Sequence, residues 1–210
     1  MWTEKQKKDA YEILLLQQQG LLEAEDNWLA NLANSSALLN ETLPETVFAG
    51  YYLFDGNELI LGPFQGRVSC TRIKMGKGVC GESAEKQETL IVDDVKTHAN
   101  YISCDSAAQS EIVVPMVKEG NLIGVLDIDC GVTKGYDEID QAFLEKYVDL
   151  LLANFSNDLN KFLKGMKQGF TYTIELEPAN ILLDIKGISV FRFFYFFIKS
   201  QVLLVFIIIF

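Results

Sequence analysis

The sequence predicts one α+β domain in which helices pack on one face of a central antiparallel sheet. Three observations lead to this prediction: two helical stretches come first, short strand-like segments with glycine turns follow, and one long amphipathic helix closes the domain. The chain has 210 residues, of which 49% are hydrophobic, enough for a substantial core. We expect the domain to span residues 1–164.

The two N-terminal helices are expected over Lys5–Gln19 and Leu21–Leu39, because apolar residues recur there near the helical period. Gly20 predicts the break between them. Strand-like segments and a short helix follow. In chain order we expect strands Val47–Phe54, Glu58–Leu61 and Arg67–Lys74, a short helix from near Cys80 to Lys86, strand Leu90–Val92 and a polar loop His98–Ser110.

The clearest hairpin joins Ile112–Val117 to Leu122–Ile128. We expect a three-residue loop, Glu119 to Asn121, which pairs Lys118 with Leu122. After the hairpin, Asp137 is expected to cap the closing helix, which runs to about Leu163.

Charge and cysteine usage narrow the class of function. The net charge of −11, from 29 acids and 18 bases, argues against nucleic-acid binding, which depends on Lys and Arg. The N-terminal segment has no pattern of a secretory signal, and four cysteines without such a signal indicate a reducing compartment. We therefore expect a cytoplasmic protein, with a nuclear location left open.

The C-terminal segment, residues 165–210, differs from the rest and is read as a hydrophobic tail outside the domain. Ile188–Phe210 is long enough to cross a bilayer as a tail anchor, although Arg192 and Lys199 interrupt it. The alternative is an artefactual or alternatively spliced end. Membrane association is expected only if this tail is native.

Three acids form the first candidate constellation. Asp127 and Asp129 are two residues apart on one strand, so their side chains leave the same face. The three-residue loop brings Glu111 opposite Asp129, whereas a two-residue loop would turn Glu111 to the other face. Clustered carboxylates repel and retain a proton near neutral pH, as a general acid must. The alternative is a strand end that reaches solvent.

Three cysteines form the second constellation: Cys70, Cys80 and Cys104 all lie beside polar or glycine residues. Thiols in such settings favour redox chemistry, although three buried small hydrophobes remain the alternative. Cys130 ends a strand and is read as incidental. There is no CxxC and His98 is the only histidine, so a zinc site built from these thiols is disfavoured and no metal is expected.

Several short motifs together resemble the free methionine-R-sulfoxide reductases, which are single GAF domains. The resemblance covers about Asn31 to Leu151, with the cysteine spacing intact. The matching segments are SALL (36–39), LGPFQG (61–66), GKGVCG (76–81), IVDDV (91–95), ISCD (102–105), SEIVVP (110–115) and GVLDID (124–129).

The resemblance implies reduction of free L-methionine (R)-sulfoxide to methionine. It implies that Cys104 is the nucleophile, that Cys70 resolves its sulfenic acid as a disulfide, and that Cys80 is a secondary or relay thiol. Glu111, Asp127 and Asp129 would then protonate the sulfoxide oxygen and hold the substrate amine. No bound cofactor is implied. Thioredoxin, which receives its electrons indirectly from NADPH, would reduce the disulfide.

The chain departs from the family pattern at the substrate wall. Phe48 stands where the family has a tryptophan, so Phe48 and Tyr52 are expected to form the aromatic surface that binds the substrate; the alternative is that Phe48 is ordinary strand core. Asn100-Tyr101 replaces a usual Gly-His before ISCD, and Cys130 replaces a usual serine. The alternatives to an enzyme are a non-catalytic GAF module that binds a small molecule and a membrane-tethered redox sensor. The oligomeric state is left open, a homodimer included.

Overall fold

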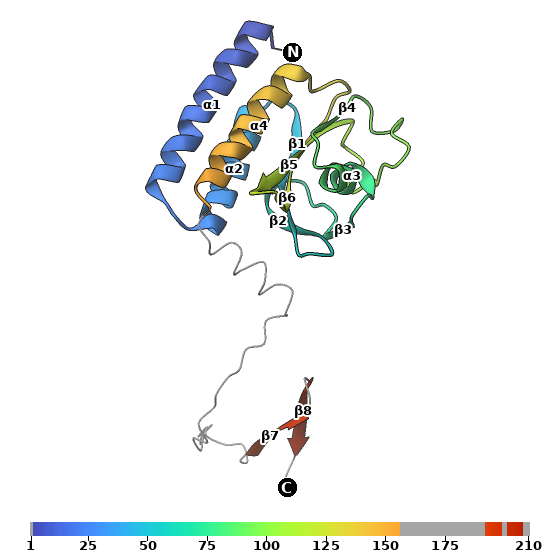
Figure 1. Cartoon of the computed structure of the whole chain (residues 1–210). Helices are drawn as coiled ribbons and strands as arrows, with labels where there is room; N and C mark the ends of the chain where they lie inside the picture. The colour runs from blue at the N-terminus through green and yellow to red at the C-terminus, as the bar shows by residue number, and fades with distance from the viewer. Residues whose placement is uncertain (1, 156–191, 199–200, 208–210) are drawn as a thin grey trace, which may run out of the picture. The chain divides into compact units, whose positions relative to one another are not determined.

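The computed structural model describes residues 2–155, 192–198 and 201–207 (Figure 1). Its contacts divide the chain into two units, residues 1–170 and 171–210. The first unit contains a six-stranded antiparallel sheet in the order β3-β2-β1-β6-β5-β4. The strands are β1 Thr46–Phe54, β2 Glu58–Gly66, β3 Arg72–Lys74, β4 Leu90–Val92, β5 Ser110–Lys118 and β6 Asn121–Cys130.

Helices cover the two faces of this sheet unequally (Figure 1). The long helices α2 (Trp28–Thr42) and α4 (Glu138–Ala153) pack against the face that carries Ala49 and Tyr51 of β1, and α1 (Glu4–Ala24) packs on these two helices. The short helix α3 (Gly78–Lys86) packs against the opposite face, which carries Phe48 and Tyr52. The predicted α+β class, with helices on one face of an antiparallel sheet, is confirmed, and α3 is an addition on the second face.

Buried hydrogen bonds fix the long helices to the sheet and to each other. The Ser35 hydroxyl of α2 bonds the Tyr51 hydroxyl of β1 at 2.6 Å and donates to the Tyr147 hydroxyl of α4 at 2.9 Å. At the other end of α4, Asp140 accepts from the Tyr11 hydroxyl of α1 at 2.8 Å. Because these polar groups are paired, their hydrogen bonds offset the cost of burying them and fix how the helices are oriented on the sheet.

The predicted break at Gly20 is wrong, because α1 continues through it to Ala24. A single glycine costs a helix only about 1 kcal/mol, and the burial of Leu22 in the core favours continuation. The chain leaves the helix at Glu25, which is extended, and α2 begins where the Asn27 side chain accepts from the backbone N–H of Ala30.

The β5–β6 hairpin corrects a second prediction. Its loop has two residues, because Lys118 pairs with Asn121, and Glu119 and Gly120 have φ angles of 53° and 74°. The expected three-residue loop is therefore wrong. An irregularity between Met116 and Val117 shifts the pairing by one residue, so Glu111 still faces Asp129. The acids meet as predicted, but a bulge rather than the loop brings them together.

Asp137 caps α4 as predicted, accepting from the backbone N–H groups of Ile139 and Asp140. The expected helix end near Leu163 and the expected domain boundary after residue 164 lie outside the described residues. In the C-terminal unit, β7 (Arg192–Ile198) pairs with β8 (Gln201–Ile207) in an antiparallel hairpin, and the rest of the predicted tail also lies outside them. Of the helices that are described, none combines the length and apolarity needed to cross a membrane.

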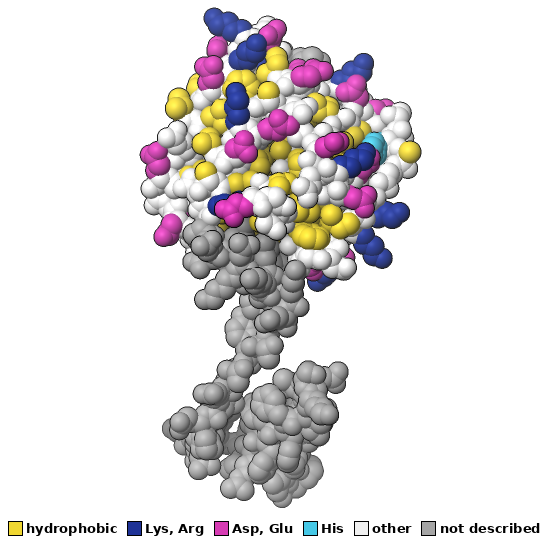
Figure 2. Space-filling model, in the orientation of Figure 1, with side chains coloured by type: hydrophobic (Ala, Val, Ile, Leu, Met, Phe, Trp, Pro, Cys, Tyr) yellow, Lys and Arg dark blue, Asp and Glu magenta, His cyan; other side chains and the backbone are white. Residues whose placement is uncertain are grey.

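The face of the first unit shown in Figure 2 carries acidic and basic side chains that are interspersed among apolar ones. Lys and Arg side chains do not gather there into one broad basic patch.

Candidate active site

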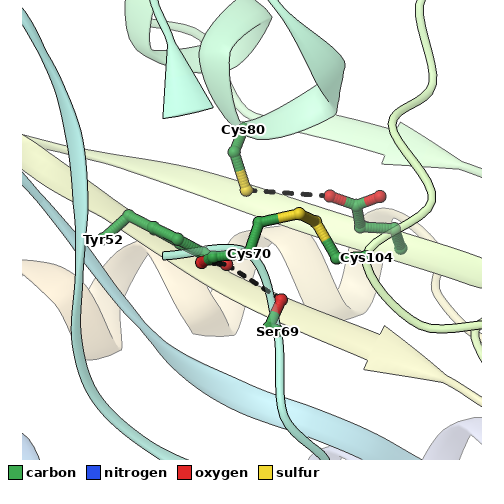
Figure 3. The surroundings of a disulfide bond; sticks show 6 residues. Tyr52, Ser69, Cys70, Cys80 and Cys104 are labelled. Atoms are coloured by element: carbon green, nitrogen blue, oxygen red, sulfur yellow. Dashed lines mark hydrogen bonds between the residues drawn. A yellow bond between two sulfur atoms is a disulfide. The ribbon is translucent and has the colours of Figure 1, made fainter. Parts of the chain in front are cut away.

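A disulfide joins Cys70, in the loop between β2 and β3, to Cys104, in the loop before β5 (Figure 3). The two Cα atoms are 5.2 Å apart although the residues are 34 positions apart in sequence. Both side chains are half-buried. The fold therefore brings together two of the three thiols that the sequence singled out, and their bond can be reached from the surface.

Tyr52 of β1 holds the Cys70 side of this bond. Its hydroxyl donates to the backbone oxygen of Cys70 at 2.9 Å and bonds the hydroxyl of Ser69 at 2.9 Å (Figure 3). The tyrosine is fully buried, and burial raises the pKa of its hydroxyl well above the usual value. The phenol consequently stays neutral and keeps its proton for hydrogen bonding.

Glu111 of β5 and Asp127 and Asp129 of β6 lie together on the α3 face of the sheet. Glu111 pairs directly with Asp129 across the two strands. The exposed fractions of the three side chains are only 5%, 4% and 8% in chain order. No described lysine, arginine or histidine forms an ion pair with any of them, so their charges are not balanced by a neighbour.

Burial raises the pKa of all three carboxyl groups. The pKa of Asp127 rises to about 7, although the polar groups of Cys80 and Glu111 favour its ionised form. The pKa values of Glu111 and Asp129 rise well above the usual range, first through burial and then through repulsion from Asp127. The cluster therefore retains protons near neutral pH, as the sequence argument expects of a general acid.

Cys80 of α3 lies beside the acids rather than in the disulfide. Its Sγ donates to Oε1 of Glu111 at 3.8 Å (Figure 3). Burial and the nearby acids Asp127 and Glu111 raise the pKa of this thiol well above its usual value. As a protonated, buried thiol, Cys80 is a poor nucleophile in this state.

A small pocket lies between α3, the Cys104 loop and the sheet. Its lining includes Cys80, Cys104, the three acids and Tyr52, together with Ser69, Tyr101 and Ile102. In the sequence, Tyr101 stands out only as a departure from the family pattern, and nothing there predicts it to be a site residue. Its position three residues before Cys104 is the signal that could have identified it.

Phe48 is not among the residues that line this pocket. Its ring stacks on Phe64 with a centroid distance of 5.3 Å and lies 6.2 Å from the ring of Tyr52. Tyr52 reaches the pocket, and Phe48 packs on the same face of the sheet beside it. A direct contact between Phe48 and a substrate stays a prediction.

Asp105, next to the candidate nucleophile Cys104, has a partner of its own. Nε of Arg67 lies 2.5 Å from its carboxylate. The backbone N–H of Ala107 makes the largest contribution to holding the pKa of Asp105 below its usual value, and Arg67 makes a smaller one. The negative charge beside Cys104 is therefore offset by a cation that the sequence argument did not identify.

The fold and the site define a GAF domain in which one cysteine of a disulfide and a cluster of buried acids line one pocket. A model of the GAF domain matches residues 36–152. GAF domain-containing protein A of Dictyostelium discoideum is 48% identical over 146 residues, which are 69% of this chain and 92% of that protein. The free methionine-R-sulfoxide reductase of Saccharomyces cerevisiae is 43% identical over 153 residues, 69% of this chain and 85% of the yeast protein.

Solved structures lead to the same family. The Neisseria meningitidis free methionine-R-sulfoxide reductase, in complex with its substrate, matches with a TM-score of 0.69 and 38% identity. The match covers 77% of this chain and 95% of the Neisseria chain. This chain belongs to the free methionine-R-sulfoxide reductase family of GAF-domain enzymes, so both the predicted family and the prediction of an enzyme are confirmed.

Proposed function

We propose that this chain reduces free L-methionine (R)-sulfoxide to L-methionine through Cys104, Cys70 and the acid cluster. The observation that carries the proposal is the Cys70–Cys104 disulfide at a pocket lined by three buried acids with raised pKa values. A sulfoxide oxygen leaves only when it is protonated. A reactive thiol beside a protonated carboxylic acid meets that requirement.

In the reduced chain, the thiolate of Cys104 attacks the sulfoxide sulfur while a carboxylic acid of the cluster donates its proton to the oxygen. The protonated oxygen then passes from the sulfoxide sulfur to the Cys104 sulfur as the transient bond between the two sulfurs breaks, so that methionine leaves and Cys104 becomes a sulfenic acid. Cys70 then attacks the Cys104 sulfur and water departs, which gives the disulfide found in this structure. The two thiols have lost two electrons, which the sulfoxide has gained.

Regeneration requires an external dithiol. Thioredoxin, itself reduced at the expense of NADPH, is the proposed reductant, because a half-buried disulfide is open to attack by a thiolate. Cys80 is buried and protonated, which supports the role of a secondary thiol rather than that of the first nucleophile. No metal or bound cofactor enters this scheme.

The carboxylates also provide a place for the substrate amine. An ammonium group that enters beside Asp127 and Asp129 compensates their buried negative charge and favours ionisation of one of them. The remaining protonated acid serves the sulfoxide oxygen. Binding of a free amino acid is thereby favoured over binding of a methionine sulfoxide within a peptide, which lacks that ammonium group.

The test is NADPH consumption by the full chain with thioredoxin and thioredoxin reductase. Free L-methionine (R)-sulfoxide, its (S) epimer and a peptide-bound sulfoxide are offered separately. We expect turnover of the free (R) epimer alone. No turnover by a folded chain whose disulfide can be reduced would contradict the proposal and favour a non-catalytic GAF binding module.

A further inference from the structure

Three side chains from three different elements converge beside the disulfide without being part of it. Cys80 comes from α3, Glu111 from β5 and Asp127 from β6, and one ligand-capable atom of each lies within 4.8 Å of the other two. All three residues are buried. A soft sulfur and two hard oxygens thus converge at the lining of the pocket.

One carboxylate oxygen of Asp127 lacks a partner. Oδ1 of Asp127 is buried and forms no hydrogen bond with any residue that the structure describes. The residue is only 4% exposed and lines the pocket. A buried carboxylate oxygen without a donor is costly, so this atom indicates that the site takes a cationic or hydrogen-bonding occupant from the pocket side.

We propose that Cys80, Glu111 and Asp127 bind Zn²⁺ as an alternative occupant of the pocket. Two ligands of a tetrahedral zinc ion, at bond lengths of about 2.3 Å for sulfur and 2.0 Å for oxygen, are separated by about 3.5 Å. The Sγ of Cys80 and the Oε1 of Glu111 are already 3.8 Å apart. The spacing to Asp127, at most 4.8 Å, needs to close by no more than about 1.3 Å.

The mixed donor set selects the class of ion. Mg²⁺ and Ca²⁺ prefer oxygen alone, and Cu⁺ prefers sulfur, whereas Zn²⁺ accepts thiolate and carboxylate together. Three protein ligands leave the fourth position to face the pocket. This site differs from the three-thiol zinc site that the sequence disfavours, because Cys70 and Cys104 are bonded to each other.

Zinc binding requires proton loss from the thiol and the carboxyl groups, with the protons released to solvent. No electron transfer is involved. If the proposed function holds, the ion takes the space beside Cys104 that the sulfoxide needs, because Cys104 lines the same pocket. Zn²⁺ is then a reversible inhibitor rather than a cofactor.

The oxidised full chain allows a test that does not depend on turnover. Its disulfide leaves Cys80 and Cys130 as the free thiols among the four cysteines. Co²⁺, added as a spectroscopic substitute for zinc, gives a sulfur-to-metal charge-transfer band only when a thiolate is a ligand. We expect this band in the unaltered chain and in Cys130→Ser, and its loss in Cys80→Ser.

Zinc affinity is measured on the same proteins by competition with a chromophoric chelator. Loss of an outer-shell partner alone weakens metal binding about 10- to 100-fold, so we expect Asp127→Asn and Glu111→Gln each to weaken it by at least about tenfold. Circular dichroism verifies that each variant is folded. No cobalt band in the unaltered chain, or a band that Cys130→Ser removes and Cys80→Ser retains, would overturn the proposal whether or not the chain is an active reductase.

Discussion

The hydroxyl of Tyr52 donates a hydrogen bond to the backbone oxygen of Cys70 at 2.9 Å. Tyr52 is part of β1, in the middle of the sheet, and its side chain is fully buried. Cys70 lies in a loop. The bond therefore connects the loop that carries one sulfur of the disulfide to a central strand of the sheet.

Replacement of Tyr52 by phenylalanine removes this connection. We expect Tyr52→Phe to lower the free energy of unfolding by about 1 kcal/mol and to slow formation of the Cys70–Cys104 disulfide after one turnover. Trapping of the Cys104 sulfenic acid with a nucleophilic probe measures the second effect. Tyr51→Phe is the matched control, because its hydroxyl bonds Ser35 on the other face. If both variants slow disulfide formation equally, Tyr52 does not position Cys70.

Cys104, Cys70 and Cys130 should differ in function. We expect Cys104→Ser to release no methionine and Cys70→Ser to release one equivalent per chain, because a sulfenic acid then has no resolving thiol beside it. Cys130→Ser is the control, since that thiol is buried on the face opposite the pocket. Mass spectrometry of a single turnover measures all of these, and full turnover by Cys104→Ser would refute the nucleophile assignment.

The acid cluster should make the oxidised chain less stable as the pH rises. Burial raises the pKa of Asp127 from 3.8 to about 7, so between these values the folded chain holds a proton that the unfolded chain has released. The free energy of unfolding therefore falls as pH increases through this window. Denaturant titrations at pH 5 and pH 8 measure the effect.

The same titrations on Asp127→Asn test whether that residue is responsible. A neutral amide cannot ionise, so we expect the variant to lose much of the decrease and to gain relative stability at pH 8. Asp149→Asn is the control, because Asp149 is exposed on α4. An unchanged pH dependence in Asp127→Asn would contradict the assignment.

Arg67 should influence the reactivity of Cys104 through Asp105. We expect Arg67→Ala to leave the Asp105 charge uncompensated, to raise the pKa of the reduced Cys104 thiol and to slow its alkylation near neutral pH. Arg67 is largely exposed, so the effect on stability should be below about 1 kcal/mol. Arg72→Ala is the control, because Arg72 pairs with Glu58 at 2.7 Å. Equal alkylation rates in all three proteins would exclude an influence of Arg67.

Local patterns in the sequence predict most of the sheet and the cap of α4, because alternation and a capping aspartate are local signals. They fail where tertiary packing decides. Gly20 reads as a break, but burial of Leu22 continues α1 through it. The hairpin shows the same limit: the loop is shorter than predicted, and a bulge near Met116 restores the pairing of Glu111 with Asp129.

The sequence singled out most of the residues that line the candidate site, but few of the contacts between them. Resemblance to the family indicated a bond between Cys70 and Cys104, which no local pattern could give for residues 34 positions apart. Arg67 and Tyr101 were not identified, because their partners come from distant segments or from the shape of the pocket. The placement of Phe48 depends on the packing of Phe64, which alternation does not reveal.

The Cys70–Cys104 bond closes a loop that contains β3, α3 and β4, the wall that carries Cys80. A cross-link across 34 residues stabilises a folded chain by roughly 4 kcal/mol in the chain-entropy model. Under the proposed cycle, each chain alternates between a cross-linked and an open form, and the open form unfolds more easily. Resistance to proteolysis should therefore follow the supply of sulfoxide and of reductant, so that a chain at work under oxidising conditions is also the longer-lived one.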